Sequence, residues 1–179
     1  MRVSDLLSAS VEPLLRGRLG RPYRFIAECA STQRLIDGDE TEGTTVATDV
    51  QTHGRGRLGR TWEAPAGRGL LFSVLLRPQP PMALWPELSL VAGDAVAAAL
   101  RVAAGVASEL SHPNDVLVEG RKVAGILAEA AGRVVLGIGV NVGTAPWPGA
   151  GAVDADRLEL LVEILDRLES GYAAWAAAG

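Results

Sequence analysis

The sequence is poor in cysteine and histidine, which limits the metal and disulfide chemistry available to it. Its 179 residues include one cysteine and two histidines. A lone cysteine, Cys29, excludes an internal disulfide framework and suits a reducing compartment, so we expect a cytoplasmic location. Cys29, His53 and His112 are too few to predict a zinc site, and no metal site made of protein ligands is expected. Cys29 lies in an apolar stretch and is interpreted as a core residue.

Long apolar runs and an excess of basic residues are also absent. No uninterrupted apolar run reaches ~18 residues, and no basic-then-apolar signal pattern opens the chain, so we expect no membrane partner. Lysine and arginine number 17 against 21 aspartates and glutamates, giving a net charge of −4. This balance argues against a general nucleic-acid binder. With 48% hydrophobic residues, the chain is predicted to form one globular domain over residues 1–179.

One segment reverses the acidic balance. Gly54 to Arg60 reads Gly-Arg-Gly-Arg-Leu-Gly-Arg, with three glycines and three arginines in seven residues. Glycine lets the backbone approach a ligand closely, and the arginine fork matches carboxylate and phosphate oxygens. We predict a loop that binds an anion carrying at least one phosphate. The alternative is an ordinary flexible connection. The segment from Gly54 to Arg60 is not a Walker loop, since no Gly-Lys-Ser/Thr ends it.

The hydrophobic pattern predicts an α+β fold. Helices are expected at residues 4–16 and 84–102, at 156–176, and for a short stretch opening at Ser31. Strands are expected at residues 23–30, 44–50, 70–76, 116–118, 123–130 and 133–142. Glu119-Gly120 is expected to join two of these strands as a hairpin. Because most strands follow one another with few helices between them, we predict a mixed, largely antiparallel sheet with packed helices.

Two more polar clusters lie downstream, at Pro113-Asn-Asp-Val116 and at Gly120-Arg-Lys-Val-Ala-Gly125. Lys122 stands beside small residues, where a backbone and a ligand can come close. Each cluster alone is also explained by a turn or by a solvated hairpin tip. Their occurrence together with the arginine loop favours a binding site.

These segments resemble those of the biotin protein ligase family. The resemblance is carried by five segments, which appear in the family's order: Glu28-Cys-Ala-Ser-Thr-Gln33, Asp49 to Arg60, Pro113-Asn-Asp-Val116, Gly120 to Glu129 and Gly137-Ile-Gly-Val-Asn-Val142. It implies a fold akin to class II aminoacyl-tRNA synthetases. It also implies a catalytic core without the N-terminal DNA-binding domain and without the C-terminal SH3-like domain.

The activity implied by the resemblance has two steps. Biotin carboxylate attacks the α-phosphate of ATP to give biotinyl-5′-AMP, with Mg²⁺ as the metal cofactor, and a lysine of a biotin carboxyl carrier domain then accepts the biotin. Two anions must meet, so positive side chains and backbone N–H groups would screen their repulsion. The alternatives are a protein that binds biotin or its adenylate with impaired transfer, and a lipoate-type ligase.

The resemblance also implies residue roles. The catalytic residues would be Arg55, Lys122 and Asp115, with an electrostatic role favoured for Asp115 over strict base catalysis. Biotin would be contacted by Ser31, Thr32, Gln33, Gln51, Arg55, Gly56, Arg57, Lys122 and Gly125. ATP and the adenylate would be contacted by Gly54, Arg55, Arg57, Arg60, Trp62, Asn114 and Asn141. For Trp62, stacking over adenine and anchoring in the core are equally favoured.

The chain departs from the family's pattern in several places. Ser111 and His112 stand where the family usually has a basic residue and a tryptophan before Pro-Asn-Asp. The segment from Gly143 to Val153 is short and lacks an Ala-Thr-Ser-Leu-like stretch. Because the resemblance also implies a core without the C-terminal SH3-like domain, we expect weaker nucleotide or partner binding. Without the N-terminal DNA-binding domain, we expect no repressor activity. An exposed sheet edge could pair two copies in a homodimer.

Overall fold

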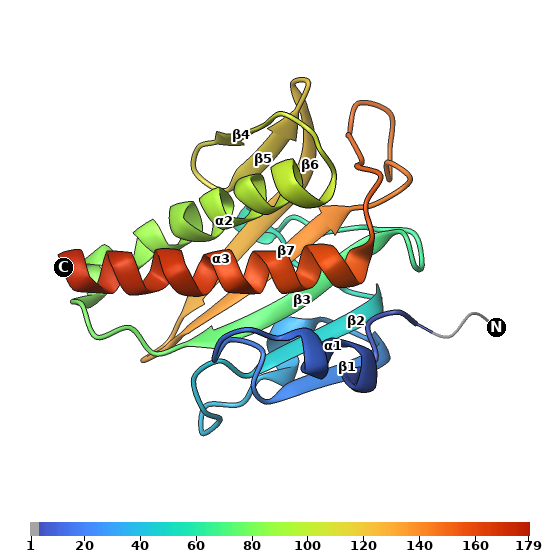
Figure 1. Cartoon of the computed structure of the whole chain (residues 1–179). Helices are drawn as coiled ribbons and strands as arrows, with labels where there is room; N and C mark the ends of the chain where they lie inside the picture. The colour runs from blue at the N-terminus through green and yellow to red at the C-terminus, as the bar shows by residue number, and fades with distance from the viewer. Residues whose placement is uncertain (1–3) are drawn as a thin grey trace.

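A computed structural model describes residues 4–179 of the chain, and one seven-stranded sheet organises it. The strand order is β1-β2-β3-β7-β6-β5-β4 (Figure 1). β1 and β2 are parallel, and every other neighbouring pair is antiparallel. The strands are β1 (Tyr23–Cys29), β2 (Thr45–Gln51), β3 (Gly69–Leu76), β4 (Ser108–Ser111), β5 (Asp115–Val118), β6 (Arg121–Ala130) and β7 (Val134–Asn141). The predicted mixed, largely antiparallel α+β architecture is confirmed.

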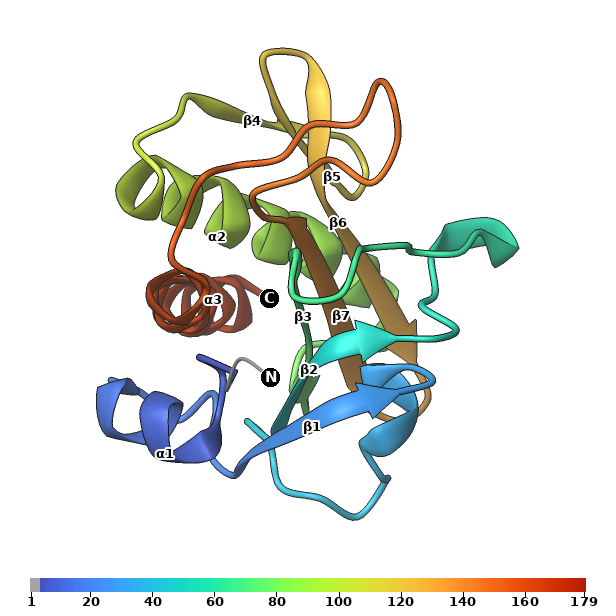
Figure 2. The same cartoon turned by 90° about the vertical axis from the view of Figure 1, so that its right-hand side faces the viewer.

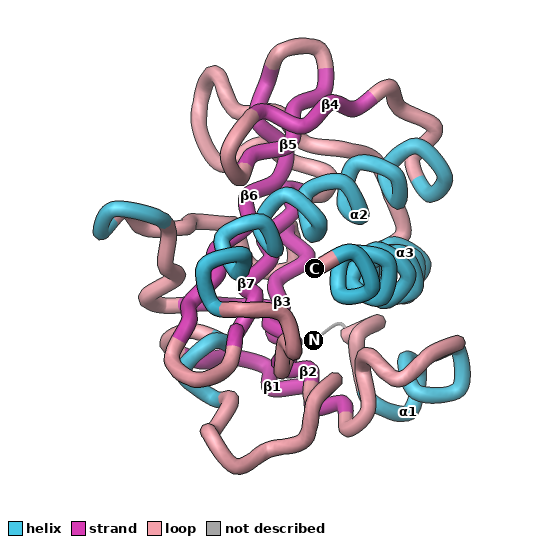
Figure 3. Tube along the Cα trace, turned by 90° about the vertical axis from the view of Figure 1, so that its left-hand side faces the viewer, coloured by secondary structure: helices cyan, strands magenta, loops and turns pink. Residues whose placement is uncertain are grey.

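The three α-helices gather on one face of this sheet (Figure 2). The α-helices are α1 (Ser8–Val11), α2 (Leu88–Ala103) and α3 (Arg157–Ala178). The 3₁₀ turns are η1 (Glu12–Leu14), η2 (Thr32–Leu35), η3 (Arg57–Gly59) and η4 (Met82–Glu87). α2 and α3 pack on each other and on the sheet, and the large hydrophobic core lies between them and the strands (Figures 1 and 3). Burial of this apolar surface is the main stabilising term of the fold.

The opposite face carries a smaller apolar cluster and leaves room for a site. Ile36, Val46, Leu75 and Val135 form this cluster, with η2 beside it. Figure 2 shows α2 and α3 on one side of the sheet, with η2 and the arm that carries η3 on the other side. All eight residues of β3 are buried, so the centre of the sheet is a fixed platform for whatever lies on either face.

Side chains of α3 tie that helix to the strand that leads into the glycine-arginine loop. The Asp156 carboxylate accepts a hydrogen bond from the Glu159 N–H at 2.9 Å and caps the helix. The buried Arg157 then donates to Asp49 Oδ1 of β2 at 2.8 Å and also pairs with Asp5. Burial by itself would lower the pKa of Arg157, but its bonds to Asp5 and Asp49 raise it. The arginine therefore stays charged and clamps β2.

Several elements differ from the sequence-based predictions. The helix expected over residues 4–16 is limited to α1 and η1, because Pro13 has no N–H to continue the helical ladder and the chain is extended at Leu15. β4 was not predicted, since Ser-Glu-Leu-Ser has little β propensity of its own and forms by pairing with β5. The hairpin at Glu119-Gly120 is confirmed, with φ of 51° and 71° at its two central residues.

One helical window also has the length and composition of a membrane span. Residues Met82–Ala103, which join η4 and α2, have a mean hydropathy of 1.3, and half of this window is buried inside the fold. The window contacts α3, β4 and β6. A core helix has these same properties, so length and composition alone are weak evidence for a membrane.

Candidate functional site

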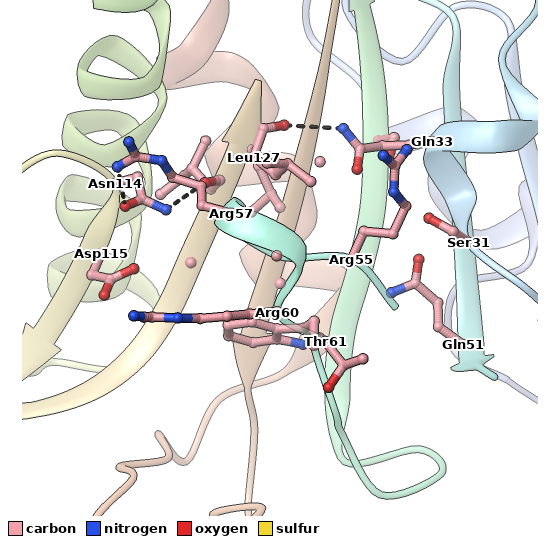
Figure 4. A pocket seen from close by; sticks show the side chains of 18 of the residues that line it. Ser31, Gln33, Gln51, Arg55, Arg57, Arg60, Thr61, Asn114, Asp115 and Leu127 are labelled. Atoms are coloured by element: carbon pink, nitrogen blue, oxygen red, sulfur yellow. Dashed lines mark hydrogen bonds between the residues drawn. The ribbon is translucent and has the colours of Figure 1, made fainter. Parts of the chain in front are cut away.

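A cavity of about 500 Å³ opens on the sheet face opposite α2 and α3. This volume lies within the roughly 300–1,000 Å³ that small-molecule sites occupy. Its walls come from η2, from the end of β2, from the glycine-arginine loop and from the β5–β6 hairpin. Segments more than a hundred residues apart in the sequence therefore meet at one hollow, which Figure 4 shows from close by.

Glycines form the floor of this cavity. Gly125 on β6 is paired with Gly139 on β7. Gly137 lies two residues before Gly139 and therefore on the same face of β7. A Cβ at Gly139 would lie 2.5 Å from the Trp62 ring, and one at Gly125 would lie 2.8 Å from it. A Cβ at Gly137 would lie 2.8 Å from the Gln33 amide carbon. The bare strands thus give Trp62 and Gln33 their places against the sheet.

Hydroxyl and amide groups gather at the η2 end of the cavity. The Thr32 N–H and hydroxyl donate to Gln51 Oε1 at 2.9 and 3.2 Å, and the Thr32 hydroxyl shares a 2.7 Å hydrogen bond with that of Ser73. The Gln33 amide donates to the carbonyl of Leu127 at 3.1 Å. Ser31 and Thr32 are each only 2% exposed. This corner suits a ligand group that both donates and accepts hydrogen bonds.

The glycine-arginine loop is a small hairpin with η3 at its tip. Trp62 N–H donates to Gly54 O at 3.0 Å, and Gly56 N–H donates to Arg60 O at 2.7 Å. A side chain at Gly54 would place its Cβ 2.2 Å from the Trp62 carbonyl oxygen, so glycine is required there. Leu58 at the tip has a φ of 56° and is 89% exposed. The tip therefore projects away from the body of the protein.

The three arginines of this loop leave it in different directions (Figure 4). Arg55 forms a two-pronged ion pair with Glu129 on β6, with Nη1–Oε2 at 2.8 Å and Nη2–Oε1 at 2.7 Å. Arg57 donates to Asn114 Oδ1 at 3.2 Å. Arg60 extends along the side of the cavity where Asp115 lies. Two of the three arginines thus have protein partners that the sequence did not reveal.

Lys122 and Asp115 meet across the β5–β6 hairpin. Lys122 Nζ is 2.8 Å from Asp115 Oδ1 and 5.5 Å from the centroid of the Trp62 ring. The pairing register shifts between Val116 and Leu117, and this bulge accompanies the approach of the two side chains. Four cationic side chains and one acidic side chain line the cavity, so it is positive in an acidic protein.

Most of the residues singled out from the sequence line this cavity. They are Ser31, Thr32, Gln33, Gln51, Arg55, Gly56, Arg57, Arg60, Trp62, Asn114, Asp115, Lys122 and Gly125. Two others do not. Gly54 is buried at the base of the loop beside the Trp62 backbone, and Asn141 is 1% exposed with its amide donating to Gly151 O at 2.9 Å. Asn141 instead holds the segment after β7 against the end of that strand.

The sequence interpretation missed part of the lining. The missed residues include Ser73, Leu127, Gly137, Gly139 and Trp147. For the two glycines there was a signal, because a Gly-x-Gly repeat inside a strand leaves one sheet face bare. Ser73 and Trp147 reach the cavity through tertiary packing, and no local pattern marks them. In residues 4–179, no group of three or more His, Cys, Asp or Glu side chains is arranged to hold a metal ion.

A known protein family matches the part of the chain that forms the cavity. The model of the biotin/lipoate A/B protein ligase family matches residues 28–144, which is more than half of the chain. The chain belongs to this family. The matched region contains most of the residues that line the cavity, from Ser31 to Gly139, so the shared family region and the cavity coincide.

Individual family members and structures are similar in sequence and in fold. The bifunctional ligase/repressor BirA of Bacillus subtilis is 39% identical over 127 residues, covering 65% of this chain and 39% of that protein. The biotin–[acetyl-CoA-carboxylase] ligase of Mycobacterium tuberculosis is 38% identical over 174 residues, covering 87% of this chain and 65% of that protein. The chain thus spans less than two thirds of each of these relatives.

A solved structure of the family superposes on most of the chain. The biotin protein ligase from Aquifex aeolicus, in complex with biotin and ATP, has a TM-score of 0.77 and 35% sequence identity. The superposition covers 86% of this chain and 71% of that one. The fold of the chain is therefore that of a biotin protein ligase catalytic unit.

Proposed function

We propose that the chain is a biotin protein ligase. It joins biotin and ATP to give biotinyl-5′-AMP and pyrophosphate, and it then transfers biotin to a lysine of a biotin carboxyl carrier domain. One observation carries the proposal: a positive cavity roofed by the glycine-arginine loop lies within the region matched by the family model. The Mycobacterium tuberculosis ligase and the Aquifex aeolicus structure support biotin as the substrate. The lone Cys29 fits a cytoplasmic enzyme.

The two ends of the cavity suit the two ends of biotin. The ureido group of biotin donates and accepts hydrogen bonds, and the corner formed by Ser31, Thr32 and Gln51 offers both kinds of partner. The apolar ring and chain would lie against the Trp62 ring, which itself covers the glycine floor. The carboxylate then points toward the loop and Lys122.

The first chemical step needs cations at its centre. The biotin carboxylate oxygen attacks the α-phosphorus of ATP, the bond from that phosphorus to the bridging oxygen breaks, and pyrophosphate leaves. Arg55, Arg57 and Lys122 would screen the repulsion between the two anions and stabilise the charge that develops on the α-phosphate. Arg60 and the Trp62 ring would face the nucleotide side. The described residues provide no cluster of metal ligands, so Mg²⁺ would arrive on the ATP phosphates and neutralise their charge.

In the second step the neutral amine of the carrier lysine attacks the acyl carbon of the mixed anhydride, the bond from that carbon to the phosphate oxygen breaks, AMP leaves, and the nitrogen loses a proton to solvent as the amide forms. Asp115 lies at the cavity wall and would hold the incoming ammonium near the reaction centre until it releases a proton to solvent and becomes the nucleophilic amine. Lys122 already occupies one oxygen of this carboxylate, so the other oxygen would receive the substrate. Closure of the loop over the cavity would protect the anhydride from water.

The direct test is incubation of the chain with ATP, Mg²⁺, biotin and a carrier domain. We expect covalent biotin on the carrier, and none on a carrier whose acceptor lysine is replaced by arginine. The same incubation with lipoate distinguishes the two substrates of the family. Preferential attachment of lipoate, or no attachment of biotin above a control without the protein, would overturn the proposal.

A further inference from the structure

Glu129 lies just outside the cavity and has no role in the chemistry described so far. It stands on β6, two residues after Leu127 and on the same face of the strand. Its carboxylate accepts two hydrogen bonds from the Arg55 guanidinium, of 2.8 and 2.7 Å, and both side chains remain partly exposed. Glu129 lines a second hollow beside the loop, together with Arg55, Gly56 and Leu58. Glu129 therefore contacts Arg55 without lining the main cavity itself.

The loop needs such a contact because of its path. It leaves the end of β2 and reaches β6, which is separated from β2 by β3 and β7. Three inter-strand steps amount to about 14 Å. Among the described residues, the backbone hydrogen bonds of residues 55–61 join the loop only to itself. Its far side is anchored by two side-chain contacts, Arg55 with Glu129 and Arg57 with Asn114.

The geometry of Arg55 lets it serve Glu129 and a ligand together. A guanidinium has five N–H donors in a rigid plane, and the carboxylate of Glu129 occupies one on each Nη. The remaining donors stay available, and Arg55 itself lines the main cavity. A carboxylate bound on one edge fixes the plane in which the other donors point.

We propose that Glu129 is a positioning residue. It holds the Arg55 guanidinium, and through it the whole loop, over the glycine floor, so that Arg55 meets the carboxylate–phosphate group of the ligand already oriented. This inference rests on the proposed ligase function for the identity of that group. Its structural half, that Glu129 fixes the loop, depends only on the observed contacts.

The kinetic test uses adenylate formation, measured as biotin-dependent pyrophosphate release. Glu129→Ala should raise KM for biotin about tenfold, the effect of losing one charged hydrogen-bond pair, and should leave kcat nearly unchanged because Arg55 is still present. In the Arg55→Ala background, where no adenylate is expected, biotin affinity is measured by calorimetry instead, and Glu129→Ala should not lower it further. The matched control is Glu109→Gln, at an exposed glutamate of β4. An unchanged or lowered KM, or an effect that adds to that of Arg55→Ala, would overturn the inference.

The second test needs no enzymatic activity. Trypsin cleaves after arginine, and the loop exposes Arg55, Arg57 and Arg60. Without ligands, Glu129→Gln should speed cleavage at these sites about tenfold while the unfolding temperature stays at the wild-type value. Cleavage of Glu129→Gln at the wild-type rate would overturn the inference. If the wild-type chain made no adenylate, the proposed function would fail, and proteolysis would still decide whether Glu129 holds the loop.

Discussion

At the scale of single residues, the site is defined by pairs of oppositely charged side chains. Lys122 illustrates this, because its ammonium contacts Asp115 and lies over the Trp62 ring at the same time. The sequence predicted Lys122 and Asp115 as site residues. It could not predict that they pair, because their contact depends on the irregular register between β5 and β6. Arg55 and Glu129 are a second such pair, and here the sequence indicated only the arginine.

We predict that Lys122→Ala slows adenylate formation by about 10²–10³-fold, because a positioned cation contributes roughly 3–4 kcal/mol to such a transition state. The control is Arg121→Ala, which removes the exposed neighbouring cation on the same hairpin. Stopped-flow measurement of pyrophosphate release would compare the two variants. If both variants matched the wild-type rate, Lys122 would be part of a solvated hairpin tip and not of the catalytic machinery.

At the scale of elements, β6 and β7 make room for the site because three of their residues are glycines without side chains. Gly125, Gly137 and Gly139 leave one face of the two strands bare, and Trp62 and Gln33 fill that space. The strand predicted over residues 133–142 included Gly137-Ile-Gly139, and β7 confirms this. The repeat signals a bare sheet face, but the sequence could not indicate what covers it, because Trp62 comes from a loop more than seventy positions away.

Gly139→Ala tests this floor. The added methyl group would lie 2.5 Å from the Trp62 ring, so the ring must move out of its place and the cavity must change shape. We expect weaker binding of biotin by at least about tenfold in calorimetry. The matched control is Gly38→Ala, whose Cβ would meet its nearest neighbour at 3.5 Å. Equal biotin affinity in both variants would contradict the proposed placement of biotin against Trp62.

At the scale of the whole molecule, one face of the sheet packs the main core and the other face carries the site. α2 and α3 bury one face in the main core, and the other face holds the cavity and the loop. The strand pattern and the Glu119-Gly120 turn were sufficient to predict the mixed sheet. The shortened N-terminal helix and β4 were mispredicted because Pro13 and the pairing with β5 outweigh the local apolar pattern.

The central claim is that this cavity forms an acyl-adenylate from biotin. The most direct measurement is the incubation of the isolated chain with Mg²⁺ and ATP labelled on its α-phosphate, with biotin or lipoate and without any carrier domain. The account predicts labelled biotinyl-5′-AMP, at most a trace of lipoyl-adenylate, and loss of the product in Arg55→Ala. ATP left unchanged in the presence of biotin, or an adenylate formed preferentially from lipoate, would contradict it.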